Sequence, residues 1–113
     1  MATVNVFEQY FSADAEFNGV QRHGAKVMLI ATSEEGNIRY EAAVTFFPHR
    51  DEEDFAVSYD AYFSKVLYEA KGRRSKKREE ALMQKFQQHI DELAHEANGT
   101  IYWEKPLREA RRG

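Results

Sequence analysis

The spacing of apolar and polar residues along this chain changes once, near residue 72. Before that point it is typical of β-strands, with a compact apolar run rich in β-branched residues and then a clear alternation. The expected strands cover residues 4–11, 25–32, 38–47 and 55–70. The last of these is long and its apolar residues shift phase, which predicts a bend near 61–64. Residues 8–17 are also compatible with an irregular or helical segment.

After Gly72 the apolar residues recur at every third or fourth position, which is the period of an amphipathic helix. These positions are Leu82, Phe86, Ile90, Leu93 and Ala97. Ser75 is a candidate N-cap, and Asn98 and Gly99 form a candidate C-terminal stop. We therefore expect one long helix over about residues 75–97, followed by a short last strand over 100–104.

The order of these elements predicts an α+β fold. We expect a mainly antiparallel, strongly curved sheet of four to five strands, with the long helix packed on one face and a short C-terminal strand. The chain has 113 residues, which is the size of a single domain covering 1–113, and the charged residues 107–113 are expected to form a frayed tail.

One helix is too narrow to cover such a sheet. Several strands carry large apolar side chains on both faces, because adjacent residues such as Phe46 and Phe47 point in opposite directions. Either the sheet curls strongly around the helix, or a second copy of the chain covers the other face. The second alternative is the basis for expecting a homodimer.

Composition excludes several classes of protein. The chain has no cysteine, which excludes a disulfide partner, a thiolate nucleophile and a zinc site built on sulfur. The N-terminus lacks the pattern of a targeting segment, and no apolar run is long enough to span a bilayer. These features predict a cytoplasmic protein that makes no membrane contact.

Catalytic motifs are absent as well. We find no nucleophile elbow and no glycine-rich phosphate loop. Glu92 and His95 form a Glu-x-x-His pair with His89 nearby, a pattern that holds metal in di-iron bundles where it occurs twice. Here it occurs once and flanks the apolar stripe, so these residues are expected at the surface. We predict no catalytic residue, no cofactor and no metal site, and hence no enzyme.

Positive charge gathers in one segment, although the net charge of the chain is −3. Between residues 71 and 78, which we call the basic segment, six residues are basic: Lys71, Arg73, Arg74, Lys76, Lys77 and Arg78. Cations at a helix N-terminus oppose the helix dipole. They do not stabilise the expected helix, which favours a binding role, although charge runs also serve as solvated joints.

Two binding functions fit this pattern. The favoured one is a small non-catalytic module that mediates protein–protein interaction, self-association included, with an unidentified partner. The alternative is a single-stranded DNA or RNA binder in which the basic segment contacts phosphates while Tyr62 and Tyr68 stack on bases. Arg108, Arg111 and Arg112 would assist it if the C-terminal tail folds back. A continuous basic and aromatic surface would favour nucleic acid, and an apolar patch remote from the basic segment would favour protein.

Overall fold

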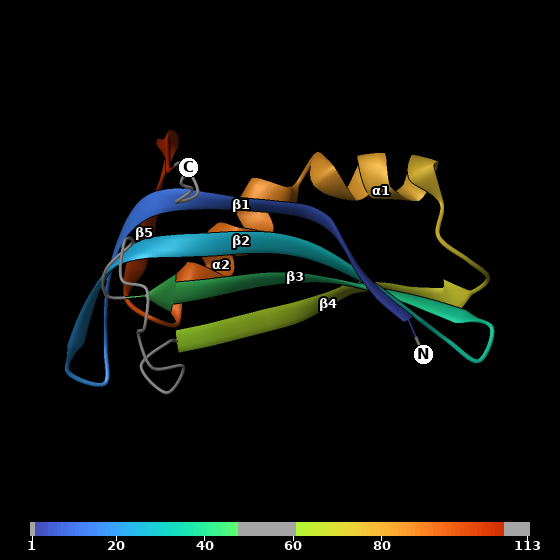
Figure 1. Ribbon diagram of the computed structural model, residues 1–113, viewed down its shortest axis with the longest axis horizontal. Coiled ribbons are helices and arrows are strands. Elements are labelled where there is room, and N and C mark those ends of the chain that lie inside the picture. The colour runs from blue at the N-terminus through green and yellow to red at the C-terminus, as the bar shows by residue number, and fades with distance from the viewer. Residues whose placement is uncertain (1, 48–60, 108–113) are drawn as a thin grey trace, which may run out of the picture.

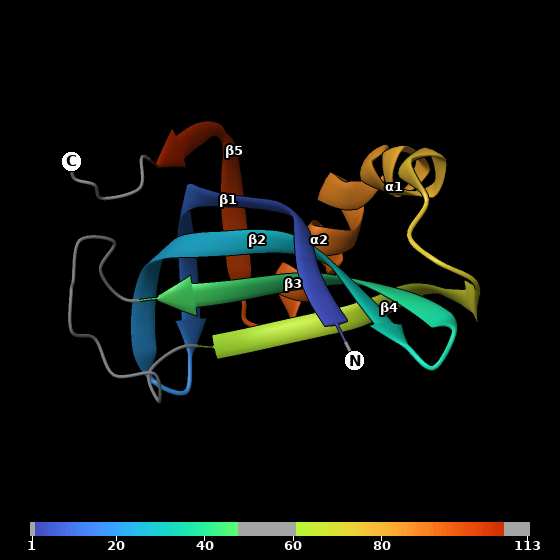
Figure 2. The ribbon, with the colours of Figure 1, turned by 45° about the vertical axis from the view of Figure 1, so that its right-hand side comes forward.

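The computed structural model describes residues 2–47 and 61–107, which form one antiparallel sheet and two short helices (Figure 1). The elements are β1 (Ala2–Phe17), β2 (Val20–Glu34), β3 (Asn37–Phe47), β4 (Ala61–Lys71), α1 (Lys76–Met83), α2 (Phe86–His95) and β5 (Gly99–Leu107). The strand order is β4-β3-β2-β1-β5, so the first four strands form a meander and the chain then returns to place β5 beside β1. Both helices lie on one side of the sheet (Figure 2).

The predicted fold class is wrong, because no single long helix packs on the sheet. The helix expected over 75–97 is interrupted at Gln84 and Lys85, whose amide groups each bond to a carbonyl three residues back at 3.3 Å. Phe86 opens α2 and is 2 % exposed, with its ring edge-on to Phe7 of β1 at 5.4 Å between centroids. Neither glycine nor proline occurs at the break, so we attribute it to this tertiary contact.

Two short turns set the register of the first three strands. The β1–β2 hairpin turns at Asn18 and Gly19, with φ of 55° and 77°, and the β2–β3 hairpin turns at Glu35 and Gly36, with φ of 54° and 80°. Positive φ at both central residues is the geometry of type I′ turns, whose twist matches that of the flanking strands. Residues 8–17 belong to β1, so the helical alternative for them is wrong, whereas the strand is irregular between Ser12 and Ala15, where its register with β2 shifts.

The other strands differ from their predicted bounds. The described part of the strand expected over 55–70 is β4, and its first six residues lie outside the described residues. Its irregularity falls at Leu67, between the residues that pair with Tyr40 and Glu41, and not near 61–64. Of the tail expected over 107–113, only Leu107 is described, and it ends β5.

The sheet curls around α2, which lies in its concave face (Figure 2). The buried residues of α2 are Phe86, Ile90, Leu93 and Ala94. Small residues allow a close approach at its end: a Cβ on Gly99 would lie 3.0 Å from the ring of Phe46 and 3.2 Å from Cβ of Ala15. A larger residue at position 99 would push β5 away from the core.

The face without helices covers part of its own apolar surface. Phe47 packs over Gly24, where an added Cβ would lie 2.6 Å from the ring atom Cζ, and edge-on to Tyr10 at 6.0 Å between centroids. Met28 and Ala43, on the same face, are 8 % and 0 % exposed. On the same face Tyr62 and Val66 remain 55 % and 51 % exposed, so its apolar surface is covered only in part and the homodimer stays a prediction.

Within residues 2–47 and 61–107, neither helix has the length and apolar character needed to cross a bilayer.

Candidate functional site

Two of the six cations of the basic segment are engaged within the protein. Arg74 donates to the carboxylate of Glu79 through Nε at 2.8 Å and Nη2 at 3.1 Å, a two-point contact. The guanidinium of Arg78 lies 4.2 Å from the ring centroid of Tyr68, in cation–π geometry. These contacts hold α1 on the sheet, although both side chains remain exposed on their outer sides.

Glu79 is the centre of a buried polar network. The hydroxyl of Tyr40, near the start of β3, donates to Glu79 at 2.9 Å and accepts from the amide of Ser75 at 3.1 Å. The hydrogen bonds from Arg74 hold the pKa of Glu79 below its ordinary value, and burial raises the pKa of Tyr40. The network fixes the start of α1 against β3.

The N-terminus of α1 is capped by its own sequence. Ser75 accepts from the amide of Arg78 through Oγ at 3.2 Å, as predicted for an N-cap, and from the amide of Glu79 through its carbonyl at 2.9 Å. The amide groups that a bound phosphate would use are in part already occupied. The start of α1 is therefore a poorer site for an anion than an uncapped helix end would be.

The remaining cations share their surroundings with acidic residues. The side chains of Lys71, Arg73, Lys76 and Lys77 are exposed and make no hydrogen bond or ion pair within the described part of the chain. The amide of Gly72 donates to the carbonyl of Gly36 at 2.8 Å. That bond places the β2–β3 turn, with its exposed acids Glu34 and Glu35, beside the basic segment. The electrostatic field around these cations therefore has contributions of both signs.

The structure separates the two predicted aromatic contacts. Tyr62 is 55 % exposed and lies on the helix-free face, where it pairs with Thr45 at the start of β4. Tyr68 pairs with Tyr40 on the opposite face and is covered by Arg78. Tyr62 and Lys71 lie at opposite ends of β4, about 30 Å apart at roughly 3.3 Å per residue. Only Tyr68 adjoins the basic segment, so no continuous basic and aromatic surface forms among these residues.

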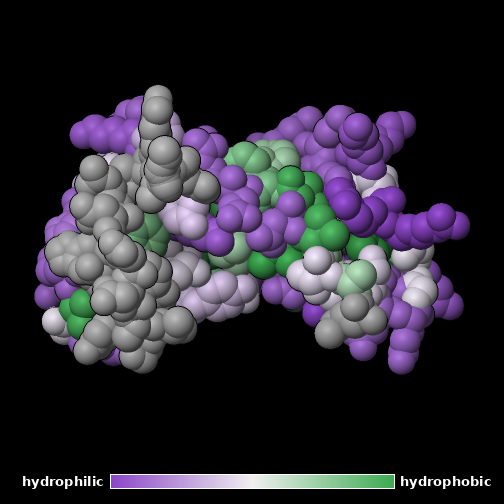
Figure 3. Space-filling view, in the orientation of Figure 1, coloured by the Kyte–Doolittle hydropathy of each residue, from purple (hydrophilic) through white to green (hydrophobic). Residues whose placement is uncertain are grey.

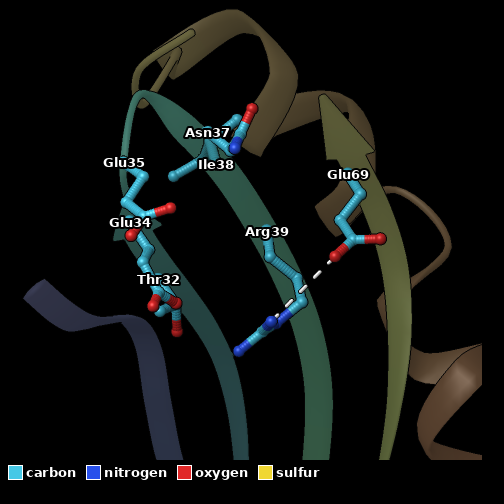
Figure 4. Close-up of a pocket in the computed structure, with 7 residues that line it drawn as sticks. All are labelled: Thr32, Glu34, Glu35, Asn37, Ile38, Arg39 and Glu69. Atoms are coloured by element: carbon cyan, nitrogen blue, oxygen red, sulfur yellow. Dashed lines mark ion pairs between the residues drawn. The ribbon is translucent and has the colours of Figure 1, made fainter. Parts of the chain in front are cut away.

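A polar pocket of about 210 Å³ lies at the end of the β2–β3 hairpin (Figure 4). Its lining residues are Thr32, Glu34, Glu35, Asn37, Ile38, Arg39 and Glu69. Arg39 donates to Glu41 through Nε at 2.9 Å and lies 4.0 Å from Glu69, so the guanidinium balances part of the acidic charge. The described residues contain no cluster of histidine and acidic side chains that could hold a metal ion.

The Glu-x-x-His pair on α2 is also accounted for by local contacts. Glu92 accepts from Lys65 of β4 at 2.8 Å, and this hydrogen bond lowers the pKa of Glu92. His89 Nδ1 lies 4.0 Å from the same carboxylate. His95 is exposed in the last turn of α2. Glu92 therefore links α2 to the edge strand β4, and no ligand set forms around it in the described residues.

The sequence did not predict an aromatic pocket that lies between β1, β5 and the break between the helices. Its volume is about 270 Å³, and its lining residues are Phe7, Phe11, Met83, Gln84, Phe86, Gln87 and Trp103. Trp103 packs edge-on to Phe11 at 4.9 Å between centroids, and its indole donates to Asp91 at 3.0 Å. We call this the aromatic pocket. No lining residue carries a charge.

The aromatic pocket adjoins a stretch of strand that lacks a neighbour. β5 pairs with β1 only from Tyr10 to Ala15, so residues 2–9 of β1 have no strand on that side within the described residues. On the helix side of this stretch, Val4 is 40 % exposed. Apolar surface shows in the middle of the molecule, beside a largely hydrophilic end at the right of the view (Figure 3).

No protein-family model matches this chain, and no curated protein and no solved structure is significantly similar to it. The function must therefore be argued from the geometry of the described residues alone.

Proposed function

We propose that this chain is a small, non-catalytic module that binds a protein partner. The observation that carries the proposal is the uncharged aromatic pocket beside residues 2–9 of β1, whose edge away from β2 has no neighbouring strand in the described part of the chain. Aromatic and methionine side chains are enriched at the centres of protein interfaces, where they supply most of the binding energy. A strand edge next to such side chains offers main-chain hydrogen bonds in addition.

The arrangement of the basic segment supports the same proposal. Arg74 and Arg78 are used within the protein, and the exposed Tyr62 lies at the far end of β4. The aromatic pocket involves none of the basic residues. This is the pattern that favours a protein partner: an apolar site formed apart from the cations.

Binding of single-stranded DNA or RNA is the second candidate. It is favoured by the four exposed cations Lys71, Arg73, Lys76 and Lys77, which can contact phosphates by charge alone. A cytoplasmic location and a homodimer remain part of the proposal. Sedimentation at several concentrations tests the homodimer, because a mass that stays monomeric into the high micromolar range contradicts it.

The experiment that tests the proposed function is site-specific photo-cross-linking in the cells that produce the protein. A photoreactive phenylalanine analogue is placed at Gln87, on the rim of the aromatic pocket, or at Lys77, in the basic segment. Gln88 is the matched control, since it is exposed on the same helix but does not line the pocket. We expect protein adducts at position 87 alone. Nuclease-sensitive adducts at position 77, without protein adducts at 87, would contradict the proposal.

A further inference from the structure

Resting on the proposed function, we infer that the partner is bound as an extended segment. It pairs with the free edge of β1 over residues 2–9 and inserts one bulky, uncharged apolar side chain into the aromatic pocket.

The backbone of β1 supplies the first argument. Residues 2–9 pair with β2 on one side, from Ala2 opposite Ser33 to Gln9 opposite Val27, and lack a strand on the other within the described ranges. A strand edge presents a row of N–H and C=O groups that an added strand satisfies. β1 bulges at Val6, which restricts the registers that an added strand can adopt.

The direction of the side chains supplies the second argument. Val4 and Phe7 pair with the core residues Ala31 and Leu29, so they face the helices. In a strand added beside them, every second side chain points to the same face. These side chains would lie next to Val4, which is 40 % exposed, and next to the mouth of the aromatic pocket.

The size and polarity of the aromatic pocket define the side chain. A volume of about 270 Å³ falls just below the range of roughly 300–1,000 Å³ typical of sites for drug-sized ligands, so it suits one side chain better than a separate molecule. Because the lining is uncharged, burying Lys, Arg, Asp or Glu there would leave a charge without a partner. The amides of Gln84 and Gln87 can bond to the main chain of the segment.

The test uses synthetic nine-residue peptides of alternating threonine and valine with a central Phe, Leu, Ala or Lys. Trp103 is the only tryptophan of the chain and lines the aromatic pocket, so its fluorescence reports occupancy without a label. We expect saturable changes with Phe and Leu, and binding at least about tenfold weaker with Ala and Lys, a difference of roughly 1.4 kcal/mol. Alternate amides of an extended peptide point to opposite edges, and only one edge meets β1. N-methylation of the amides on that edge should abolish binding, and N-methylation of the other set should leave it unchanged.

Two variants assign the site without disturbing the core. Gln87→Arg places a charged side chain at the rim of the aromatic pocket and should weaken the Phe peptide about tenfold or more, whereas Gln88→Arg should leave it unchanged. Equal effects of the two variants would overturn the inference. Binding that is unaffected by N-methylation of both sets of alternate amides would overturn it as well.

Two further outcomes would also overturn it. If a chain that ends at Leu107 binds the peptides and the full chain does not, the edge of β1 is assigned to the chain's own C-terminal residues. No response to any peptide, combined with protein cross-links at position 87, would refute strand addition while leaving the protein-binding function in place.

Discussion

The hydroxyl of Tyr40 lies 2.9 Å from the carboxylate of Glu79, which joins two residues 39 positions apart. Arg74 completes the contact from the basic segment at 2.8 Å. Part of the charge that marks this segment in the sequence thus serves to fix α1 on β3. The contacts among Tyr40, Glu79 and Arg74 form a structural clamp, to which the basic segment contributes. The aromatic pocket lies elsewhere.

Replacing Tyr40 by phenylalanine tests the clamp. The change removes the hydroxyl that donates to Glu79 and accepts from Ser75, and leaves both groups without that partner. We expect the free energy of unfolding to fall by about 1–3 kcal/mol, measured by urea denaturation. Tyr68→Phe is the matched control, because the Tyr68 ring stacks with Arg78 and its hydroxyl has no hydrogen-bond partner within the described residues. A loss of unfolding free energy no larger than that of Tyr68→Phe would refute the clamp.

The clamp also predicts a pH dependence. The pKa of Glu79 in the folded protein lies below its ordinary value of 4.5, chiefly because Arg74 donates to it. A lowered carboxyl pKa contributes stability that is fully present above about 4.5 and is lost as the pH falls through the folded-state value. The difference in unfolding free energy between the wild type and Glu79→Gln should therefore be largest near neutral pH and shrink in acid. A difference that grows as the pH falls would contradict this assignment.

The contact between Gly24 and Phe47 predicts a specific steric cost. A Cβ at position 24 would collide with the Phe47 ring, so Gly24→Ala should cost about 1–3 kcal/mol of stability. In a background of Phe47→Leu the same change should cost much less, because the shorter side chain leaves room for the methyl group. Thermal unfolding of the two single variants and the double variant gives the coupling energy. Strictly additive costs would show that the two residues do not compete for space.

The pattern of the sequence predicts individual strands better than it predicts their assembly. The alternation over 38–47 corresponds to β3, and the run over 25–32 lies within β2, because one face of each strand is continuously buried. The first hairpin was missed even though Asn18 and Gly19 are the dipeptide most typical of a type I′ turn. That signal was present in the sequence and could have extended the first strand to Phe17.

The helical layer and the candidate site were less accessible to sequence reasoning. The apolar period runs from Leu82 through Phe86 without a glycine or a proline, so nothing local predicts that the helix breaks there. The break depends on the packing of Phe86 against Phe7, 79 positions away in the chain. The aromatic pocket arises from that break and from the limited pairing of β5 with β1, both of which are tertiary features.

We propose that this chain binds protein segments and not nucleic acid. Fluorescence anisotropy of labelled single-stranded and duplex oligonucleotides, measured across a salt series, tests it most directly. We predict no binding tighter than about 100 µM at physiological salt, the weak limit of ordinary non-specific contacts. Micromolar binding that weakens steeply with salt and disappears in the variant Lys71→Glu, Lys76→Glu, Lys77→Glu would contradict the claim and assign the exposed cations to nucleic acid.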